Sequence, residues 1–363
     1  MDTAELDYEL PPDRIATTPA EPRDAARLMV IWRREDRIEH HTVADLHRIP
    51  GALQPGDLMI FNQTRVLAAQ FTGRRGATGG RVRGLYLSSS GNAEWRLMLE
   101  ARGKLQPGER IELGDSASNL ELIRTLGNGE WSAKVSSPLD TQSLLDQIGT
   151  PPLPPYIQNQ RRRQGEPDSR PEDVIAYNTV FAADPGSVAA PTAALHFTPG
   201  LLKAIDGTGI HRATLTLHIG LGTFAPIRTN AVGEHEMHEE YMTIPAVTIQ
   251  SLREARASGR TIMPVGTTCV RSIESLSNPL PSDPAGMRGQ TNLYIHPDLT
   301  ASGRFRFRFT DAMMTNFHLP RSSLLALVAA LPHVGIDRLK NWYRIAIDEG
   351  YRFYSYGDAM LLL

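Results

Sequence analysis

The sequence predicts an α/β protein that carries a small β-barrel as an insertion. Helical and strand patterns alternate after residue 172, short alternating strands fill residues 67–150, and buried strands precede that block. We therefore expect a discontinuous α/β catalytic domain made of residues 1–66 and 151–363, with the inserted barrel domain at 67–150. At 363 residues the chain is long enough for both.

The first apolar runs, "RLMVIW" (27–32) and "DLMIFN" (57–62), are bounded by turn residues, which is typical of buried strands. From residue 67, segments such as "RVRGLYL" and "EWRLML" alternate between Gly-Gly, Pro-Gly and "GNGE" turns, which favours a small sandwich or barrel. "PPLPPY" (151–156) then predicts a stiff connector, and "RRRQ" (161–164) predicts a loop.

Helices and strands alternate in the remainder of the chain. "DVIAYNTVFAA" predicts a helix, and "TPGLLKAIDGTG" predicts another with a threonine cap and a glycine stop. "RATLTLHIG" predicts a strand, "AVTIQSLREARASG" an amphipathic helix and "RTIMPVG" a further strand. "SSLLALVAAL" and "DRLKNWYRIAIDEG" predict the last helices. This alternation implies a largely parallel sheet.

Composition excludes several classes of protein. No apolar run approaches the length of a bilayer span, and the acidic first ten residues argue against a secretory signal peptide. The single cysteine, Cys269, excludes intrachain disulfides and is compatible with a reducing cytoplasm. A net charge of −2 argues against nonspecific coating of nucleic acid but allows RNA binding by a local patch.

Ligands of α/β domains bind where strands run out into loops and helix N-termini, and one such junction is "MPVGTTCVRSIESL" (263–276). Gly266 allows a close turn, and Thr267 and Thr268 can cap the helix or bind a ligand oxygen. Arg271 is expected about one turn into the helix. An ordinary capped helix start is the alternative interpretation.

Three further junctions offer polar side chains or close backbone. They are "LHIGLGTFAP" with Gly220, Gly222 and Thr223, "GSVAAPTAALHFTPG" with Thr192 and His196, and "TNFHLPRSS" with Asn316 and His318. A tight turn, a partly buried histidine and a helix cap are their respective structural alternatives.

The segment "GEHEMHEEY" (233–241) places His235 and His238 among glutamates. A zinc site needs three or four ligands, which Glu234, Glu236 or Glu239 and a distant histidine such as His196, His218 or His318 could complete. The glycine-led loop lacks the helical H-E-x-x-H arrangement. Metal binding, acid–base chemistry and a structural role all stay open on this pattern alone.

A series of segments, taken together, carries a family resemblance. In chain order they are "DYELPPDRIA", "EPRDAARLMV", "PGDLMIFNQTRV", "LPPYI", "GSVAAPTAALHFTP", "TLHIGLGTFAPI", "EHEMHEEY", "VGTTCVRSIES", "TNFHLPRSSLLALV" and "YRFYSYGDAM". This series resembles the S-adenosylmethionine:tRNA ribosyltransferase-isomerase family, from about Leu6 to Met360.

The resemblance implies a cytoplasmic enzyme with an α/β domain and an inserted β-barrel. Its members use S-adenosylmethionine as a ribosyl donor. The acceptor is the aminomethyl group of a 7-deazaguanine at the wobble position of tRNAs with a queuosine-type anticodon. Adenine and methionine leave, and the sugar becomes the epoxycyclopentane of epoxyqueuosine. No metal or additional cofactor is expected, and we expect a monomer.

The resemblance gives the candidate residues their hypothetical roles. His235, His238 and His196 would handle protons, and Glu234 or Glu239 would orient an imidazole. The groups expected to hold substrate are Thr192, Gly220, Gly222, Thr223, Gly266, Thr267, Thr268, Arg271, Asn316 and His318. The arginines expected to contact RNA phosphates are Arg74, Arg75, Arg81 and Arg83 of the barrel block with Arg161, Arg162 and Arg163. Solvated surface charge is the alternative for these arginines.

Several positions depart from the family pattern: Gln63 stands for a shorter Asp or Asn, Arg83 for a glutamate, Ala194 for a glycine and Cys269 for a serine, and "YNTVF" (177–181) replaces "YQTVY". They support two alternatives. One is a divergent paralogue that binds S-adenosylmethionine with another acceptor or as a sensor. The other is a metal-dependent hydrolase built on the histidine loop.

Overall fold

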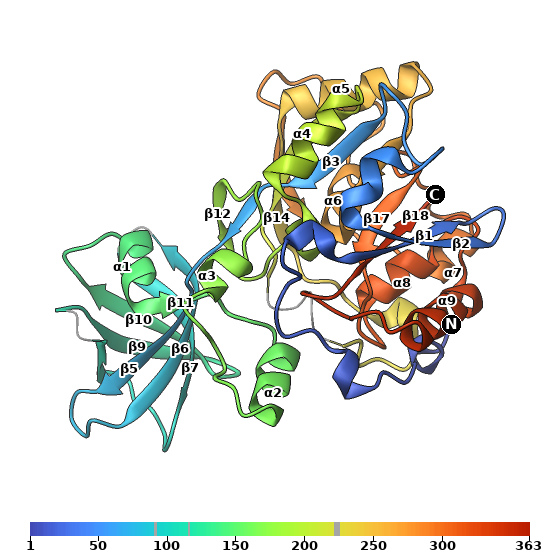
Figure 1. Ribbon diagram of the computed structural model, residues 1–363. Helices are drawn as coiled ribbons and strands as arrows, with labels where there is room; N and C mark the ends of the chain where they lie inside the picture. The colour runs from blue at the N-terminus through green and yellow to red at the C-terminus, as the bar shows by residue number, and fades with distance from the viewer. Residues whose placement is uncertain (91–92, 115–116, 221–225) are drawn as a thin grey trace. The chain divides into compact units, whose positions relative to one another are not determined.

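The structure is a computed structural model that describes residues 1–90, 93–114, 117–220 and 226–363 (Figure 1). The chain forms two compact units. The first comprises Met1–Arg65, Pro154–Asp168 and Asn178–Leu363, and the second comprises Val66–Leu153 and Ser169–Tyr177. The α/β class with an inserted barrel is confirmed, and the domain boundaries at 67 and 150 stay a prediction.

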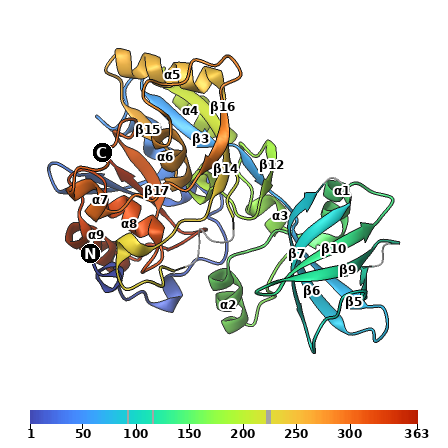
Figure 2. The same cartoon turned by 180° about the vertical axis from the view of Figure 1, so that it is seen from behind.

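The first unit is built on two mixed sheets, which Figure 2 shows from behind. The five-stranded sheet has the order β15 (Ile262–Pro264), β3 (Leu58–Asn62), β13 (His211–Leu217), β14 (Glu240–Ile244) and β16 (Met287–Thr291). The four-stranded sheet has the order β17 (Met313–Asn316), β18 (Ala359–Leu362), β1 (Arg27–Trp32) and β2 (Arg37–Thr42). A two-stranded pair joins β12 (Asp184–Ser187) to β4 (Thr64–Val66).

Helices cover these sheets. The α-helices of the first unit are α2 (Pro155–Arg163), α4 (Pro199–Gly207), α5 (Ala246–Ala257), α6 (Thr267–Glu274), α7 (Pro297–Ala301), α8 (Ser323–Ala329) and α9 (Ile336–Asp348). Its short 3-10 helices are η1 (Thr3–Leu6), η2 (Pro12–Arg14), η3 (Arg23–Ala25), η4 (Val43–Arg48), η5 (Thr192–His196) and η7 (Val232–Glu234). Among the described residues, no helix has the length and hydropathy that crossing a bilayer requires.

The two apolar runs near the N-terminus are confirmed as strands buried on both faces. In β1, Met29 packs into the core under α8 and α9, while Leu28 packs toward η5 and α4. In β3, Phe61 shares this second core, and Ile60 packs under α5 and α6. A strand with helices on both sides reads as a continuous apolar run, because alternate side chains all find a core.

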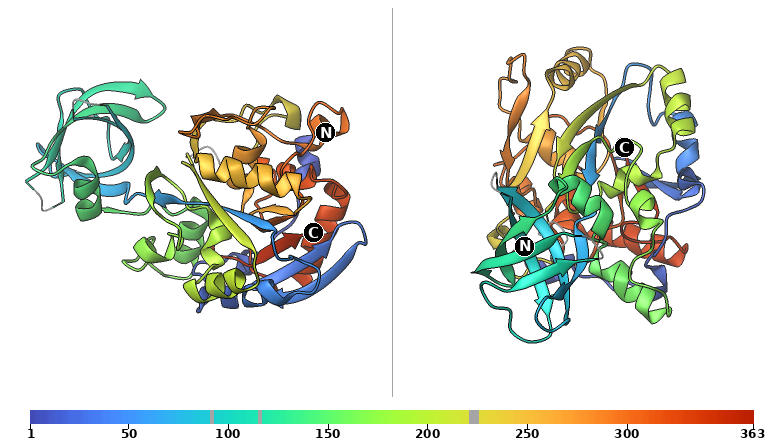
Figure 3. Two further views of the ribbon diagram at one scale, coloured as in Figure 1. Left: turned by 90° about the horizontal axis from the view of Figure 1, so that it is seen from above. Right: turned by 90° about the vertical axis from the view of Figure 1, so that its left-hand side faces the viewer.

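The second unit is a closed antiparallel barrel, which Figure 3 shows from two further directions. Its strands are β5 (Gln70–Arg75), β6 (Arg81–Ser90), β7 (Glu94–Ala101), β8 (Arg110–Leu113), β9 (Asn119–Gly127) and β10 (Glu130–Ser136). The β5–β8 pairing closes the ring. Helices α1 (Thr141–Ile148) and α3 (Asp173–Ala176) and the short strand β11 (Gly149–Thr150) complete the unit.

The prediction of a largely parallel sheet was wrong. Parallel pairing joins β15, β3 and β13, and joins β1 to β18, whereas β14, β16, β2 and β17 all pair antiparallel. Parallel neighbours need a crossover, usually a helix. In the described part of the β13–β14 connection only the single turn η7 is helical, so β14 returns antiparallel to β13.

Two local predictions were also wrong. The loop predicted at 161–164 is largely the last turn of α2, in which Pro155 opens the helix and Ile157 and Arg161 are buried one turn apart. The helix predicted from "DVIAYNTVFAA" ends at Ala176. Beyond it, the Thr179 hydroxyl accepts the Phe181 amide at 3.2 Å, a local bond that competes with helix formation.

Candidate functional site

The two sheets meet at the N-terminus of α6. Val265, just after β15, forms a parallel bridge with Met314 of β17, and the Gly266 amide donates to the Met314 carbonyl at 2.8 Å. Gly266 adopts φ 93°, a backbone conformation that favours glycine, and it is the N-cap of α6. The predicted junction of strand, glycine turn and helix is therefore confirmed.

A small cavity of about 30 Å³ opens at this junction. Its polar and backbone lining includes Thr192, Gly266, Thr267, Thr268, Thr315 and His318, and Ile219 and Leu324 are among its apolar neighbours. Five of the residues expected to hold substrate thus line one cavity, although they come from three separate stretches of the chain. Thr315 was not among the residues predicted from the sequence.

Strand β3 positions the Thr268 hydroxyl. The Asn62 side-chain amide donates to the Thr268 Oγ1 at 3.3 Å and to the Leu217 carbonyl at 2.9 Å, while its Oδ1 accepts the Leu217 amide at 3.1 Å. Asn62 is fully buried, so these bonds tie the end of β3 to β13 and to α6. Asn62 could have been singled out from the sequence, because it is a polar residue at the end of a buried apolar strand.

His318 faces the same cavity in its neutral form. Its Nε2 lies 2.9 Å from the Thr315 hydroxyl, and its backbone amide donates to the Tyr343 hydroxyl at 2.9 Å. The Tyr8 hydroxyl donates to its carbonyl oxygen. Burial lowers the pKa of His318 to about 3, because desolvation disfavours the imidazolium. It is therefore suited to donate or accept a hydrogen bond without charge.

His196 is buried against Asn316, with Nε2 3.0 Å from the Asn316 Oδ1. The Asn316 amide nitrogen donates to the carbonyls of Tyr354 and Ser355 at 2.9 and 3.2 Å. Burial lowers the pKa of His196, and the hydrogen bond to Asn316 opposes this shift. Asn316 therefore positions His196 and is occupied within the protein.

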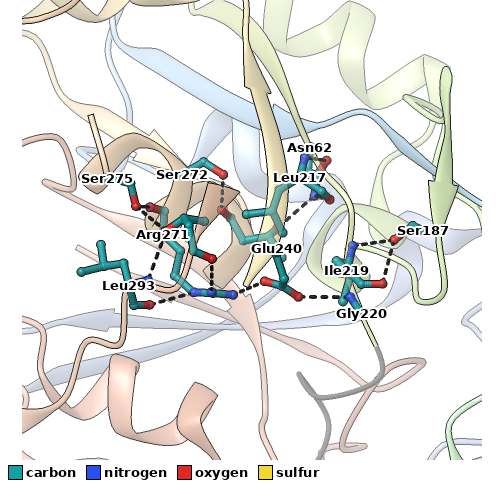
Figure 4. A network of polar contacts seen from close by, with 12 residues as sticks. Asn62, Ser187, Leu217, Ile219, Gly220, Glu240, Arg271, Ser272, Ser275 and Leu293 are labelled. Carbon is teal, nitrogen blue, oxygen red and sulfur yellow. Dashed lines mark hydrogen bonds and ion pairs between the residues drawn. The ribbon is translucent and has the colours of Figure 1, made fainter. Parts of the chain in front are cut away.

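A polar contact, drawn in Figure 4, joins the two ends of the connection between β13 and β14. The Gly220 amide donates to Glu240 Oε1 at 3.2 Å, and Glu240 Oε2 pairs with the guanidinium of Arg271. The Arg271 Nε donates to the Leu293 carbonyl at 3.0 Å. Arg271, expected to bind substrate, is therefore buried in an ion pair.

Sequence reasoning missed Glu240, although a signal was present. Glu240, Met242 and Ile244 alternate along β14 and share its buried face. A glutamate on such a face needs a buried cation, because an unpaired buried charge is costly.

The histidine loop itself is more exposed. His235 is half-buried with its ring edge-on to Tyr294 at a centroid distance of 5.4 Å, whereas Glu234, His238 and Glu239 are exposed. Burial, and then the nearby His238, lower the pKa of His235. Neither histidine is among the described residues that line the 30 Å³ cavity.

Tyr294 is a second residue that the sequence did not single out. Its ring also packs on His296 at 4.9 Å, and its hydroxyl is buried without a hydrogen-bond partner among the described residues. Burial raises the pKa of Tyr294, so its hydroxyl stays protonated. The His235 ring thus lies beside a tyrosine whose buried hydroxyl can donate a hydrogen bond.

His218 directly follows β13 of the five-stranded sheet. Its Nδ1 lies 2.8 Å from the Thr64 hydroxyl, and Gly186 packs so closely on its ring that a Cβ there would come within 2.8 Å. Burial lowers the pKa of His218, and Asp184 opposes this shift. Asp184 in turn accepts the Gln63 amide at 3.0 Å, which gives the longer side chain of Gln63 a partner.

Two other departures also fit the structure. Ala194 lies buried in η5 and is not among the positive-φ residues, so alanine brings no backbone strain there. Cys269 is fully buried, and burial raises the pKa of its thiol. A thiol with a raised pKa is a poor nucleophile.

Gly222 and Thr223 lie outside the described residues. Within the described ranges, no three His, Cys, Asp or Glu side chains form a group that could hold a metal ion.

The predicted RNA-contacting arginines fall into two groups. Arg75 pairs with Glu109, Arg162 pairs with Asp168, and the buried Arg161 donates to the Thr17 carbonyl at 2.9 Å. Of the predicted set, the other four arginines are exposed and form no ion pair with the described residues: Arg74, Arg81, Arg83 and Arg163. Arg74 and Arg81 stand directly opposite each other on β5 and β6.

Comparisons with known proteins cover the whole chain. A family model described as "Queuosine biosynthesis protein" matches residues 3–362. The S-adenosylmethionine:tRNA ribosyltransferase-isomerase of Heliobacterium modesticaldum is 38% identical over 363 residues, 100% of both chains. That of Rubrobacter xylanophilus is 42% identical over 100% of this chain and 98% of the relative. The crystal structure of S-adenosylmethionine tRNA ribosyltransferase from Thermotoga maritima is similar with a TM-score of 0.53 at 31% identity, covering 99% of this chain and 100% of that one.

Proposed function

The chain belongs to the S-adenosylmethionine:tRNA ribosyltransferase-isomerase family, and from this membership we propose the reaction that it catalyses. It transfers the ribosyl moiety of S-adenosylmethionine to 7-aminomethyl-7-deazaguanine in tRNA and isomerises it, giving epoxyqueuosine, adenine and methionine. The observation that carries this proposal is sequence similarity along the whole chain, through both the α/β and the barrel segments.

The cavity at the N-terminus of α6 supports binding of the donor. Thr192, Thr267 and Thr268 offer hydroxyls, and the start of a helix favours groups that accept hydrogen bonds. A volume of about 30 Å³ is far below the several hundred Å³ of a small-molecule site. We infer that S-adenosylmethionine enlarges the cavity as it binds.

The chemistry needs neutral proton acceptors. The sulfonium acidifies the adjacent C5′ proton, so a positioned base speeds its removal, and adenine leaves more readily when a donor protonates it. His235 and His196 both have lowered pKa values, which keeps their imidazoles neutral near pH 7. We propose His235, His238 and His196 for these steps, with exposed Glu234 or Glu239 orienting an imidazole once substrate is bound.

The second substrate is tRNA, and the exposed arginines of the barrel support a contact with its phosphates. Arg74 and Arg81 face each other across β5 and β6, a like-charge pair that a bound phosphate would stabilise. Glu112 of β8 is opposite Arg74, and Glu100 of β7 is opposite Arg83 of β6. We propose Arg74, Arg81 and Arg163 as contacts and leave out Arg75, Arg161 and Arg162, which bond within the protein.

The decisive experiment incubates the protein with S-adenosylmethionine and a tRNA that carries the aminomethyl-deazaguanine at its wobble position. Nucleosides from the digested tRNA are analysed by mass, and adenine is measured in the supernatant. Epoxyqueuosine with an equal amount of adenine is expected. Adenine without a change in the tRNA would instead indicate a paralogue with another acceptor.

The protein is expected to prefer tRNAs with a queuosine-type anticodon, to act as a monomer, and to work in the cytoplasm. The same assay with tRNAs of other anticodons tests the first, sedimentation of the active protein tests the second, and fractionation of cells tests the third.

A further inference from the structure

The Glu240 side chain joins the two ends of the connection between β13 and β14, beside a backbone hydrogen bond from the His218 amide to the Tyr241 carbonyl at 2.9 Å. The connection leaves β13 through Gly220 and returns at Glu240, twenty residues later, and the Glu240 carboxylate accepts the Gly220 amide at 3.2 Å. Figure 4 shows this carboxylate lying between Gly220 and Arg271. The proposed acid–base residues His235 and His238 lie on this connection.

The same carboxylate is anchored to α6 by Arg271. The two side chains are only 2% and 3% exposed, so both charges are desolvated and each depends on the other. The guanidinium also donates to the carbonyls of Leu293 and Thr291 at 3.0 and 3.5 Å. Thr291 is directly opposite Glu240 on β16, so the ion pair fixes the strand edge, the helix and the connection together.

Helix α6 begins at the cavity. Thr267 and Thr268 line that cavity, and Arg271 lies one turn further along the same helix. The bonds from Gly220 through Glu240 to Arg271 therefore run from the base of the histidine-bearing connection to the proposed donor site. A buried ion pair with further hydrogen bonds has few alternative geometries, which makes this link rigid.

We propose that Glu240 and Arg271 are positioning residues for ribosyl transfer, which set the histidine-bearing connection against the substrate groups at the start of α6. This inference rests on the proposed function. Small displacements of reacting groups reduce the rate much more than the affinity, and a misplacement near 1 Å can cost about 100-fold. The pair is therefore expected to act on kcat rather than on KM.

The test compares Glu240→Gln, Arg271→Met and the double variant with the parent protein. Glu240→Gln keeps an oxygen that can accept the Gly220 amide but removes the charge. Each single variant is expected to lower kcat about 100-fold and to change the KM for S-adenosylmethionine by less than about threefold. Because the two residues act as a unit, the double variant is expected to be no slower than either single variant.

Glu274→Gln is the matched control, since it removes a buried carboxylate from the same helix. Glu274 is 4% exposed and accepts the amides of Arg308 and Phe309 and the Thr310 hydroxyl, away from the connection. It is expected to lower the melting temperature but to keep kcat within about twofold. All proteins are assayed below the lowest melting temperature of the set. If Arg271→Met does not fold, Arg271→Lys takes its place.

Three results would overturn the inference: near-normal kcat in the single variants, losses that multiply in the double variant, or an equal loss of kcat in Glu274→Gln. Hydrogen exchange gives a reading that does not depend on turnover. Amides of residues 226–239 should exchange faster in the Glu240 and Arg271 variants than in Glu274→Gln. Should the parent protein make no epoxyqueuosine, the proposed function fails, and hydrogen exchange still decides whether the pair fixes the connection.

Discussion

Asn316 determines which nitrogen of His196 carries the proton. The Asn316 amide nitrogen donates to two backbone carbonyls, so its Oδ1 faces the His196 Nε2 at 3.0 Å and must accept a hydrogen bond from it. Nε2 is then the donor, and Nδ1 of the neutral ring keeps its lone pair. Among the described residues no partner occupies Nδ1, so His196 is held in the tautomer that can act as a base.

Replacing Asn316 with aspartate should move the acid limb of the pH–rate profile upward. A carboxylate at this position stabilises the imidazolium and therefore raises the pKa of His196. A base must be unprotonated to act, so activity at mildly acidic pH falls while activity at high pH recovers. The profile of kcat/KM measures this. An unchanged acid limb in a folded Asn316→Asp protein would exclude His196 as the base.

Replacing His235 or His238 with glutamine should reduce ribosyl transfer by about 100- to 10,000-fold, the usual contribution of a general acid or base. Both side chains are at least partly exposed, so the variants should melt near the parent temperature. His211→Gln is the control, because His211 is an exposed histidine at the opposite end of β13. Near-normal formation of epoxyqueuosine in both variants would remove the loop from the mechanism.

Gly266→Ala should weaken binding of S-adenosylmethionine. Its φ of 93° strains any other residue, and the new Cβ would lie 3.5 Å from the Ala193 Cβ, at the cavity. We expect the KM to rise about tenfold, which corresponds to about 1.4 kcal/mol. Gly335→Ala is the control for backbone strain alone, because Gly335 is also a helix N-cap in the same backbone region, at φ 71° and ψ 162°, with nothing within 4 Å of the Cβ. Equal effects of both substitutions on KM would contradict the assignment.

Acid should destabilise the fold through His318. Its pKa is about 3 in the folded protein against 6.5 for the free side chain, so below pH 6.5 the unfolded chain binds a proton that the folded chain does not. Stability is therefore fully present above 6.5 and is lost as the pH falls toward 3, by up to about 1.4 kcal/mol per pH unit. Urea unfolding from about pH 7 to pH 4 measures the slope. In His318→Asn, the slope of the unfolding free energy against pH should fall by the equivalent of close to one bound proton. His211→Asn, at an exposed histidine, serves as the control.

The double variant Arg74→Ala/Arg81→Ala should bind tRNA more weakly at unchanged KM for S-adenosylmethionine. Each lost phosphate contact lowers the slope of log K against log salt by about 0.7 to 0.9. Arg124→Ala is the control, because Arg124 is an exposed arginine on β9 of the same barrel. A loss that Arg124→Ala reproduces would reflect net charge rather than a contact.

Local patterns in the sequence were sufficient for the main elements. The apolar runs of β1 and β3 predicted buried strands, and the alternating segments after residue 67 predicted the barrel. The glycine and threonines at 266–268 predicted the turn into α6. These features depend on neighbouring residues, so hydrophobic period, caps and turn chemistry encode them directly.

Tertiary structure decided how distant residues combine. Nothing local distinguishes a parallel from an antiparallel neighbour, so the pairing of β14 and β16 became known only from the fold. The same holds for Arg271, whose residue type suits a substrate carboxylate, but whose charge is matched by Glu240, 31 positions away. Sequence by itself determined the family, the elements and the chemical groups available. Only the fold decided which of those groups face a cavity and which are used to hold the protein together, because strand register and burial depend on contacts between distant segments.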